Sequence, residues 1–148
     1  MKKIKNKKAY HDYEILEEYE AGLVLKGAEV KPITNGHISL NESFVSILNG
    51  EVFLKNAQIT LDSNILYDRP DPKRDRKLLL NKKEIAKLSA AVKTKGYTIV
   101  PLEIYKSKTN KFKIKIGLAK GLKNYDKRAK LKEKDQKRDM SRAMKREF

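Results

Sequence analysis

The chain has 148 residues, a formal net charge of +16 and no cysteine, and 36% of its residues are charged. This length predicts one domain with a modest core, and the missing cysteines exclude disulfides, thiolate zinc sites and cysteine nucleophiles. The basic start lacks the apolar core of a signal peptide, and no run reaches the ~18 apolar residues that span a bilayer. We therefore expect a cytoplasmic protein with no membrane partner. A charge this positive favours a polyanion, and nucleic acid is the commonest one.

The positive charge is spread over the whole chain. Twelve basic and five acidic residues between positions 120 and 148 give +7, which leaves +9 for residues 1–119. Both parts are basic, which disfavours a neutral domain with a basic tail. We expect a basic N-terminal arm over 1–8, an RNA-binding body over 9–119 and a basic C-terminal tail over 120–148.

The first third of the chain predicts a loose start, strands and a short turn. Five lysines in residues 1–8 predict a loose segment. Residues 10–25 are rich in Tyr, Ile, Leu and Val and predict one or two strands, with a break near Ala21-Gly22. Residues 27–31 predict a short helix or turn whose extension Pro32 limits.

A β-hairpin is predicted around Asn49-Gly50, the pair that favours a two-residue type I′ turn. This turn pairs Ile47 with Val52 and Val45 with Leu54, so these four residues share one face. The opposite face is half apolar. One buried face and one partly covered face are typical of a curled sheet.

A basic loop and a helix are predicted next. Residues 63–77 predict a loop with a basic patch that is either solvated or in contact with RNA, and its density favours RNA; the patch consists of Arg69, Lys73, Arg74, Arg76 and Lys77. Asn81 predicts a helix N-cap with Glu84 in the matching capping position, and Gly96 predicts the helix end. The apolar stripe of this helix is Ile85, Leu88 and Val92.

A second hairpin is predicted from residues 97–106 and 111–120. In its second strand a core face of Phe112, Ile114, Ile116 and Leu118 alternates with lysines. Pro101 lacks an amide donor, so its strand lies at an edge or is bulged there. Five or six short strands and one clear helix predict a mainly β fold with flanking helices, an OB-like small antiparallel β-barrel.

Enzymatic features are weak. Glu14, Glu17, Glu18 and Glu20 cluster, but a solvated strand rim explains them better than acid–base chemistry. His11 and His37 have no metal-ligand spacing, and there is neither a glycine-rich phosphate loop nor a nucleophile elbow. We expect a protein that is not an enzyme and that binds no metal or cofactor.

Binding features are stronger. Tyr10, Tyr13 and Tyr125 offer faces for stacking on unpaired bases, although strand packing explains Tyr10 and Tyr13 equally well. In the tail, Asp126 and Lys130 form a favourable i,i+4 pair, whereas Lys130 and Lys134 repel. We expect a tail that is disordered when free and helical where phosphates cancel the repulsion; a permanently solvated tail is the alternative.

Several long blocks resemble the tmRNA-binding small protein B family, also called SsrA-binding protein. They are NKKAYHDYEILEEYEAGLVLKGAEVK, DPKRDRKLLLNKKEI, KGYTIVPL, and IGLAKG followed by YDKR, in order over residues 6–146. The resemblance implies an OB-like adaptor, monomeric when free, that binds the tRNA-like domain of tmRNA. With elongation factor Tu, it would bring tmRNA to ribosomes stalled on a message without a stop codon. Its tail would pass the decoding centre into the empty mRNA channel of the small subunit.

The resemblance also implies which residues contact RNA. Contacts of the body with tmRNA would come from Asn6, Lys7, Lys8, Tyr13, Glu20, Lys31, Lys77, Leu79, Asn81, Gly121 and Lys123. Contacts of the tail with the ribosome would come from Tyr125, Asp126, Lys127, Arg128, Met144 and Lys145. Tyr125 would stack at the decoding centre, and Met144 and Lys145 would belong to a distal helix.

The chain departs from the family pattern at four positions. Pro32 and Thr34 stand where Ser and Arg are common, and Leu122 replaces a lysine, so each change removes an expected phosphate contact. Ala143 stands where a larger aliphatic residue is usual. A generic OB-fold RNA-binding or ribosomal protein with a non-specific basic tail is the alternative function.

Overall fold

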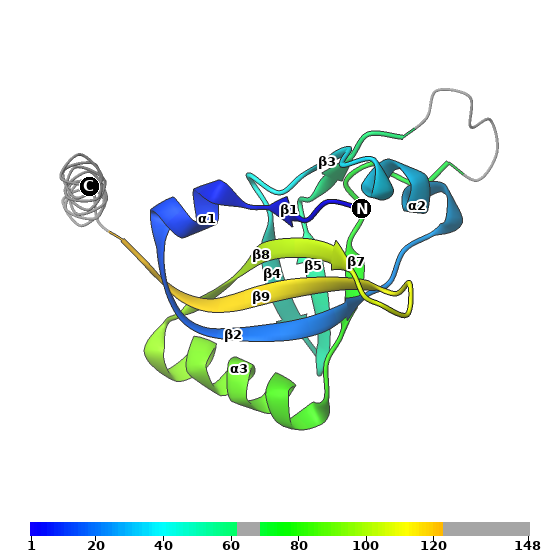
Figure 1. Cartoon of the computed structure of the whole chain (residues 1–148). Coiled ribbons are helices and arrows are strands. Elements are labelled where there is room, and N and C mark those ends of the chain that lie inside the picture. The colour runs from blue at the N-terminus through cyan, green and yellow to red at the C-terminus, as the bar shows by residue number, and fades with distance from the viewer. Residues whose placement is uncertain (62–68, 123–148) are drawn as a thin grey trace, which may run out of the picture.

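The computed structural model describes residues 1–61 and 69–122 (Figure 1). Its elements are β1 (Ile4–Lys5), α1 (Lys7–Asp12), β2 (Tyr13–Leu23), α2 (Gly27–Thr34), β3 (Ile38–Ser39), β4 (Phe44–Leu48), β5 (Glu51–Lys55), β6 (Gln58–Ile59), β7 (Arg76–Leu79), α3 (Lys82–Lys95), β8 (Thr98–Lys106) and β9 (Phe112–Gly121). The predictions for the tail beyond residue 122 and for residues 62–68 lie outside this description.

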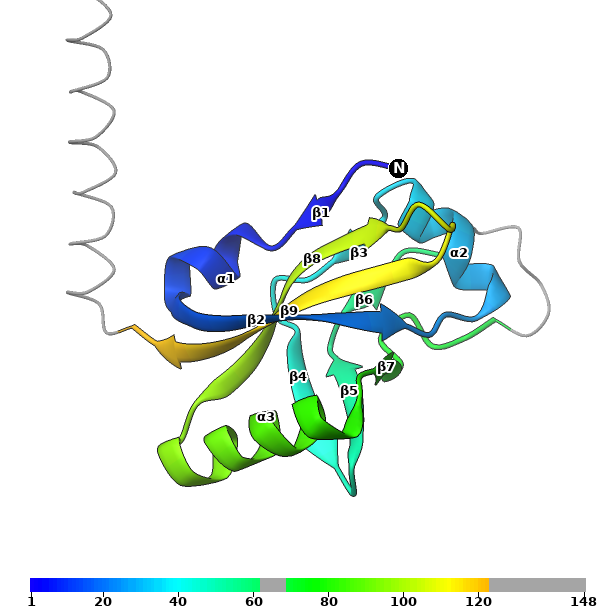
Figure 2. The ribbon, with the colours of Figure 1, turned by 60° about the horizontal axis from the view of Figure 1, so that its bottom comes forward.

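The main sheet closes on itself. Its strands follow the order β1-β8-β4-β5-β7-β2-β9, and β9 also pairs with β8, so six strands form a ring. All pairings are antiparallel. The shortest pairing in the ring joins β4 and β8, where Val45 and Ile99 are the one matched pair. Figures 1 and 2 show α1 and α2 near opposite ends of the β2–β9–β8 layer and α3 below it. The predicted OB-like fold is confirmed.

The hairpin β4–β5 forms as predicted. Ile47 lies opposite Val52, and Val45 lies opposite Leu54. Asn49 and Gly50 have φ angles of 51° and 76°, which a type I′ turn requires at both central residues. The local turn chemistry therefore sets this register.

The hairpin β8–β9 also forms as predicted, with Ile114 and Ile116 fully buried. The register shifts between Pro101 and Glu103. On its other side β8 pairs with β4 at Ile99 and with β1 at residues 103–104, so Pro101 lies at the bulge, between these two pairings.

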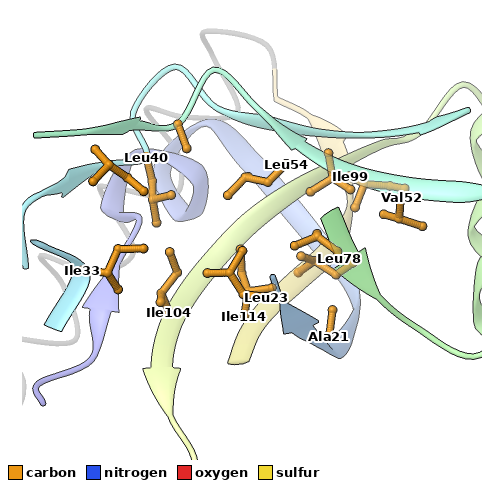
Figure 3. Packing of buried hydrophobic residues seen from close by; sticks show 14 of the residues in the cluster. Ala21, Leu23, Ile33, Leu40, Val52, Leu54, Leu78, Ile99, Ile104 and Ile114 are labelled. Atoms are coloured by element: carbon orange, nitrogen blue, oxygen red, sulfur yellow. The ribbon is translucent and has the colours of Figure 1, made fainter. Parts of the chain in front are cut away.

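Apolar side chains from all walls of the ring meet inside it. Figure 3 labels Ala21, Leu23, Ile33, Leu40, Val52, Leu54, Leu78, Ile99, Ile104 and Ile114 in this core. Each fully buried Leu or Ile contributes roughly 1.5–3 kcal/mol. A second, smaller cluster forms from Ala9, Val100, Leu102 and Ala119. It packs α1 onto the strands.

The helix α3 begins and ends as predicted, but its stripe differs. The Asn81 side chain accepts the Glu84 N–H at 2.8 Å, and Gly96 ends the helix with φ 67°. Leu88 is fully buried, whereas Val92 is 37% exposed. Ala91 packs against the core in its place, so the stripe continues three residues after Leu88 and not four.

Three expectations for the start of the chain are wrong. Ile4 and Lys5 pair with β8 and α1 begins at Lys7, so this segment is not loose. β2 runs unbroken through Ala21-Gly22, and its irregularity lies at Ile15/Glu17. The helix α2 continues two residues past Pro32, because Pro32 and Ile33 pack inward and the N–H groups of residues 35–37 satisfy the last carbonyls.

Close packing at β9 gives a first test. A Cβ on Gly117 would lie 2.9 Å from Leu102 Cδ1 and 3.0 Å from Ile15 Cγ2, whereas one on Gly27 would meet nothing within 4 Å. We expect Gly117→Ala to lower the free energy of unfolding by about 1–3 kcal/mol, measured by urea denaturation. Gly27→Ala is the matched control and should not destabilise the protein. Equal stability of the two variants would contradict the packing described.

Candidate nucleic-acid interface

One group of candidate residues gathers at the α1 end of the molecule. Lys7 and Lys8 are exposed on α1, and the Lys8 ammonium lies 2.8 Å from the Glu42 carboxylate. Tyr13 begins β2 directly after α1 and lies opposite Gly121 at the end of β9. The structure thus brings the start of β2 and the end of β9 together near α1 (Figure 1).

Asn6 belongs to this group in sequence but is 3% exposed. Its side-chain N–H₂ donates to the carbonyls of Pro101 at 2.9 Å and Leu40 at 3.3 Å. Its side-chain oxygen accepts the Ala9 N–H at 3.4 Å and caps α1. The polar atoms of this side chain are therefore bonded within the protein.

Tyr10 and Tyr13 are half-buried against the smaller cluster. Burial, together with the nearby Glu103 and Glu18 carboxylates, raises the pKa of Tyr10. Their rings therefore take part in protein packing, which was one of the two predicted interpretations.

A second group lies where β2 meets β7. Gly22 is opposite Leu79, and the Val24 N–H donates to the Lys77 carbonyl at 3.0 Å. Leu79 is 55% exposed, and its side chain lies beside the position where a Cβ on Gly22 would stand. Because residues two apart in a strand share a face, Glu20 faces the same side as Leu79.

Glu20 is held in place by Tyr105. The Tyr105 hydroxyl donates to the Glu20 carboxylate, and the Lys3 ammonium lies 5.6 Å from the centre of the Tyr105 ring. Burial and this hydrogen bond raise the pKa of Tyr105 to about 12. The carboxylate is therefore fixed on the outer face of β2, the face that also carries the exposed leucine.

The remaining candidates of the body do not all lie on one surface. Lys77 is exposed, with its ammonium 3.5 Å from the Glu51 carboxylate, and Asn81 caps α3. Lys31 lies on α2, at the other end from α1, beside a hollow of about 520 Å³. Lys123 and the tail candidates Tyr125, Asp126, Lys127, Arg128, Met144 and Lys145 lie outside the described residues.

The predicted basic patch of 69–77 is wrong in part. Arg76 is fully buried, and its guanidinium donates to Glu29 Oε2 at 2.7 Å and 3.0 Å. Arg76 also donates to the carbonyls of Ala57 and Pro72. Arg74 donates to both oxygens of Glu29. Two of the five cations are thus bound to one buried carboxylate and hold α2 against β7.

Glu29 stays ionised despite its burial. Burial alone would raise the pKa of this carboxyl, but hydrogen bonds from Arg74, the Lys26 N–H and Arg76 outweigh it and hold the pKa below its usual range. The same carboxylate closes the capping box of α2 by accepting the Lys26 N–H at 2.8 Å. One side chain therefore joins helix, loop and strand.

Two more acidic residues of β2, Glu17 and Glu18, have partners within the protein. The Tyr19 hydroxyl donates to Glu17, and the Lys115 ammonium lies 3.6 Å from the Glu18 carboxylate.

Over residues 1–61 and 69–122, no group of His, Asp and Glu side chains could hold a metal ion. In the same ranges, no helix is long and apolar enough to cross a membrane.

Comparison with known proteins identifies the family. The model of the family described as "SmpB protein" matches residues 3–146. The chain belongs to the SmpB family. The SsrA-binding protein of a Nitratiruptor species is 55% identical over 141 residues, covering 95% of this chain and 94% of that one. The SsrA-binding protein of Geotalea uraniireducens is 51% identical over 140 residues, covering 95% and 92%.

A solved structure agrees with this family. It is described as "tmRNA-SmpB: a journey to the center of the bacterial ribosome" and superposes with a TM-score of 0.68 at 42% identity, covering 85% of this chain and 92% of that one. The resemblance found in the sequence is thereby confirmed.

Three of the four residues that depart from the family pattern lie within the described part of the chain. Pro32 is a buried residue of α2 itself, and the Thr34 hydroxyl donates to the Val30 carbonyl at 2.8 Å. Leu122 is half-buried, and its N–H donates to the Asp12 carbonyl at 3.0 Å. Ala143 lies outside the described residues.

The Glu29 cluster gives a second test. Glu29→Gln leaves the buried Arg76 without its anionic partner, so the free energy of unfolding should fall by about 3–5 kcal/mol. Glu42→Gln, in the exposed pair with Lys8, should leave it nearly unchanged, because solvent screens this pair. Urea denaturation at pH 7 measures both, and equal effects would contradict the buried network.

The pH dependence of the Glu29→Gln effect tests whether Glu29 is charged. Because the pKa of this carboxyl is lowered in the folded protein, its contribution is present above the ordinary value of 4.5 and is lost as the pH falls through the folded pKa. The stability difference between the native chain and Glu29→Gln should therefore shrink below about pH 4.5. A difference that does not depend on pH would contradict an ionised Glu29.

Proposed function

We propose that this SmpB-family protein is a non-enzymatic adaptor of trans-translation. Its body binds the tRNA-like domain of tmRNA, and its tail enters the empty mRNA channel of a stalled ribosome. Relatives at 50–55% identity are named SsrA-binding protein, which supports tmRNA as the ligand. The net charge of +9 on residues 1–119 supports binding of an RNA by the body itself.

The observation that carries this proposal is the surface formed by Glu20, Lys77 and Leu79. The exposed leucine offers an apolar platform for a base or ribose. The carboxylate that Tyr105 fixes can accept hydrogen bonds from base or ribose donors. The lysine neutralises phosphate. Such a combination can distinguish between bases or riboses. Lysines alone cannot do so, because phosphate contacts carry no sequence information.

The other predicted residues add contacts outside this surface in the proposal. Lys7 and Lys8 on α1 and Lys31 on α2 would contact phosphates, and Gly121 would let RNA approach the end of β9. Asn81 would act through the start of α3. Lys123 would continue the contact beyond the body.

The tail completes the proposed role. Tyr125 would stack at the decoding centre, with Asp126, Lys127 and Arg128 directing the tail into the channel. Met144 and Lys145 would belong to a helix that forms there, where rRNA phosphates cancel the repulsion between its lysines. Elongation factor Tu would join through tmRNA. The protein would act as a monomer in the cytoplasm.

A competition experiment tests the function against its alternative. Labelled tRNA-like domain is bound to the full chain and displaced with either unlabelled tRNA-like domain or an equal mass of unrelated structured RNA. The proposal predicts that the unrelated RNA competes at least tenfold less well, whereas a generic OB-fold RNA-binding protein would be displaced equally by both. Equal competition would contradict the specific function.

A matched pair of leucines tests the surface. Leu79 and Leu16 are 55% and 40% exposed, but Leu16 lies beside Ala90 and Ala91 of α3, outside the proposed interface. Leu79→Ala should weaken binding of the tRNA-like domain by up to about 1.5–3 kcal/mol, the value of fully burying a leucine side chain. Leu16→Ala should leave the dissociation constant unchanged within twofold. Equal affinities of the two variants would exclude this surface.

A further inference from the structure

The last described residue of the body is attached to α1 by a hydrogen bond outside the strand pairing. The strand β9 ends at Gly121, opposite Tyr13. One residue later, the Leu122 N–H donates to the Asp12 carbonyl at 3.0 Å. Asp12 is the final residue of α1. The direction in which the chain continues toward residue 123 is therefore set against the end of this helix.

The helix α1 needs support from the rest of the fold. It has six residues, which is too short for a helix that is stable alone. One support is apolar: Ala9, 3% exposed, packs on Val100 and Leu102. The other support is polar and comes from the residue that precedes the helix.

Asn6 supplies that polar support with both ends of its amide. The oxygen caps the helix at Ala9, and the nitrogen donates to carbonyls from two other segments, at Leu40 and Pro101. Its own backbone N–H donates to the Leu102 carbonyl at 2.8 Å. One side chain, 3% exposed, thus joins α1 to β8 and to the turn before β4.

We propose that Asn6 is a positioning residue that acts on the tail through α1. Asn6 fixes the start of the helix, and the Asp12 carbonyl at its end fixes Leu122, so the pair sets the direction in which the tail leaves the body. This inference rests on the proposed function, because that direction affects activity only if the tail must enter a channel while the body holds tmRNA.

Two substitutions remove the two ends of this connection. Leu122→Pro deletes the amide that donates to Asp12, and it lies after the last strand, so the sheet keeps its pairing. Leu122→Ala is its matched variant, since it keeps the N–H. Asn6→Asp keeps the size of the side chain and the oxygen that caps α1, but it replaces the donor that faces two carbonyls with an acceptor.

Function is measured in two assays with the full chain. The first is the dissociation constant for the tRNA-like domain, and the second is the rate of tagging on stalled ribosomes. Leu122→Pro and Asn6→Asp should keep the dissociation constant within threefold and lower the tagging rate at least tenfold. Leu122→Ala should keep both within threefold. Tagging at the native rate in Leu122→Pro would overturn the inference. So would a loss of RNA affinity in Asn6→Asp as large as its loss of tagging, because Asn6 would then act on the body.

Amide hydrogen exchange tests the connection without RNA or ribosomes. In Asn6→Asp the Leu122 amide should exchange at least tenfold faster than in the native chain, while the Ile114 and Ile116 amides in β9 keep their rates. Unchanged exchange at Leu122 would overturn the connection, whatever the tagging assay gives. If exchange changes as expected but the native chain shows no preference for the tRNA-like domain, the proposed function fails and the connection stands.

Discussion

The whole arrangement depends on the double pairing of β9. This strand pairs with β2 on one side and with β8 on the other, which closes six strands into a ring around Ile114 and Ile116. The same pairing determines where the candidate binding residues lie. Tyr13 is opposite Gly121 at one end of β2, and Glu20 is opposite Lys115 toward the other end. The two candidate surfaces are thus fixed relative to each other by backbone hydrogen bonds, and the tail begins where one of them ends.

Net charge alone is a poor guide to which cations can meet RNA. The chain carries +16, and this charge attracts any polyanion. Yet Arg74 and Arg76, in the basic segment 69–77, both bind the buried Glu29 and hold α2 on β7. The surface that we propose to discriminate between RNAs contains instead a carboxylate fixed by Tyr105 and an exposed leucine. In this account the lysines contribute affinity, and Glu20 and Leu79 contribute selectivity.

The sequence predicted those features whose causes are local. The Asn49-Gly50 turn, the Asn81 cap and the alternation in β9 each depend on residues within a few positions of one another, and all three form. The Glu29–Arg76 pair joins residues 47 apart, so no spacing rule could reveal it, and the two arginines therefore looked like free cations. Similarly, Asn6 matches a family motif, but the carbonyls that bury its amide come from Leu40 and Pro101, far along the chain. Family resemblance can name a residue without saying whether it contacts RNA or positions what does.

The most direct test of the account is to map the tRNA-like domain on the isotope-labelled full chain by NMR. We predict that its addition shifts or broadens the amide signals of Glu20, Lys77 and Leu79 and those of α1. Signals of the β8–β9 turn at Ser107–Asn110 should stay unchanged. This turn is informative because Lys106, Lys108 and Lys111 surround it, so simple charge attraction would also affect it. Equal broadening over all lysine-rich surfaces would contradict a specific tmRNA interface on this body.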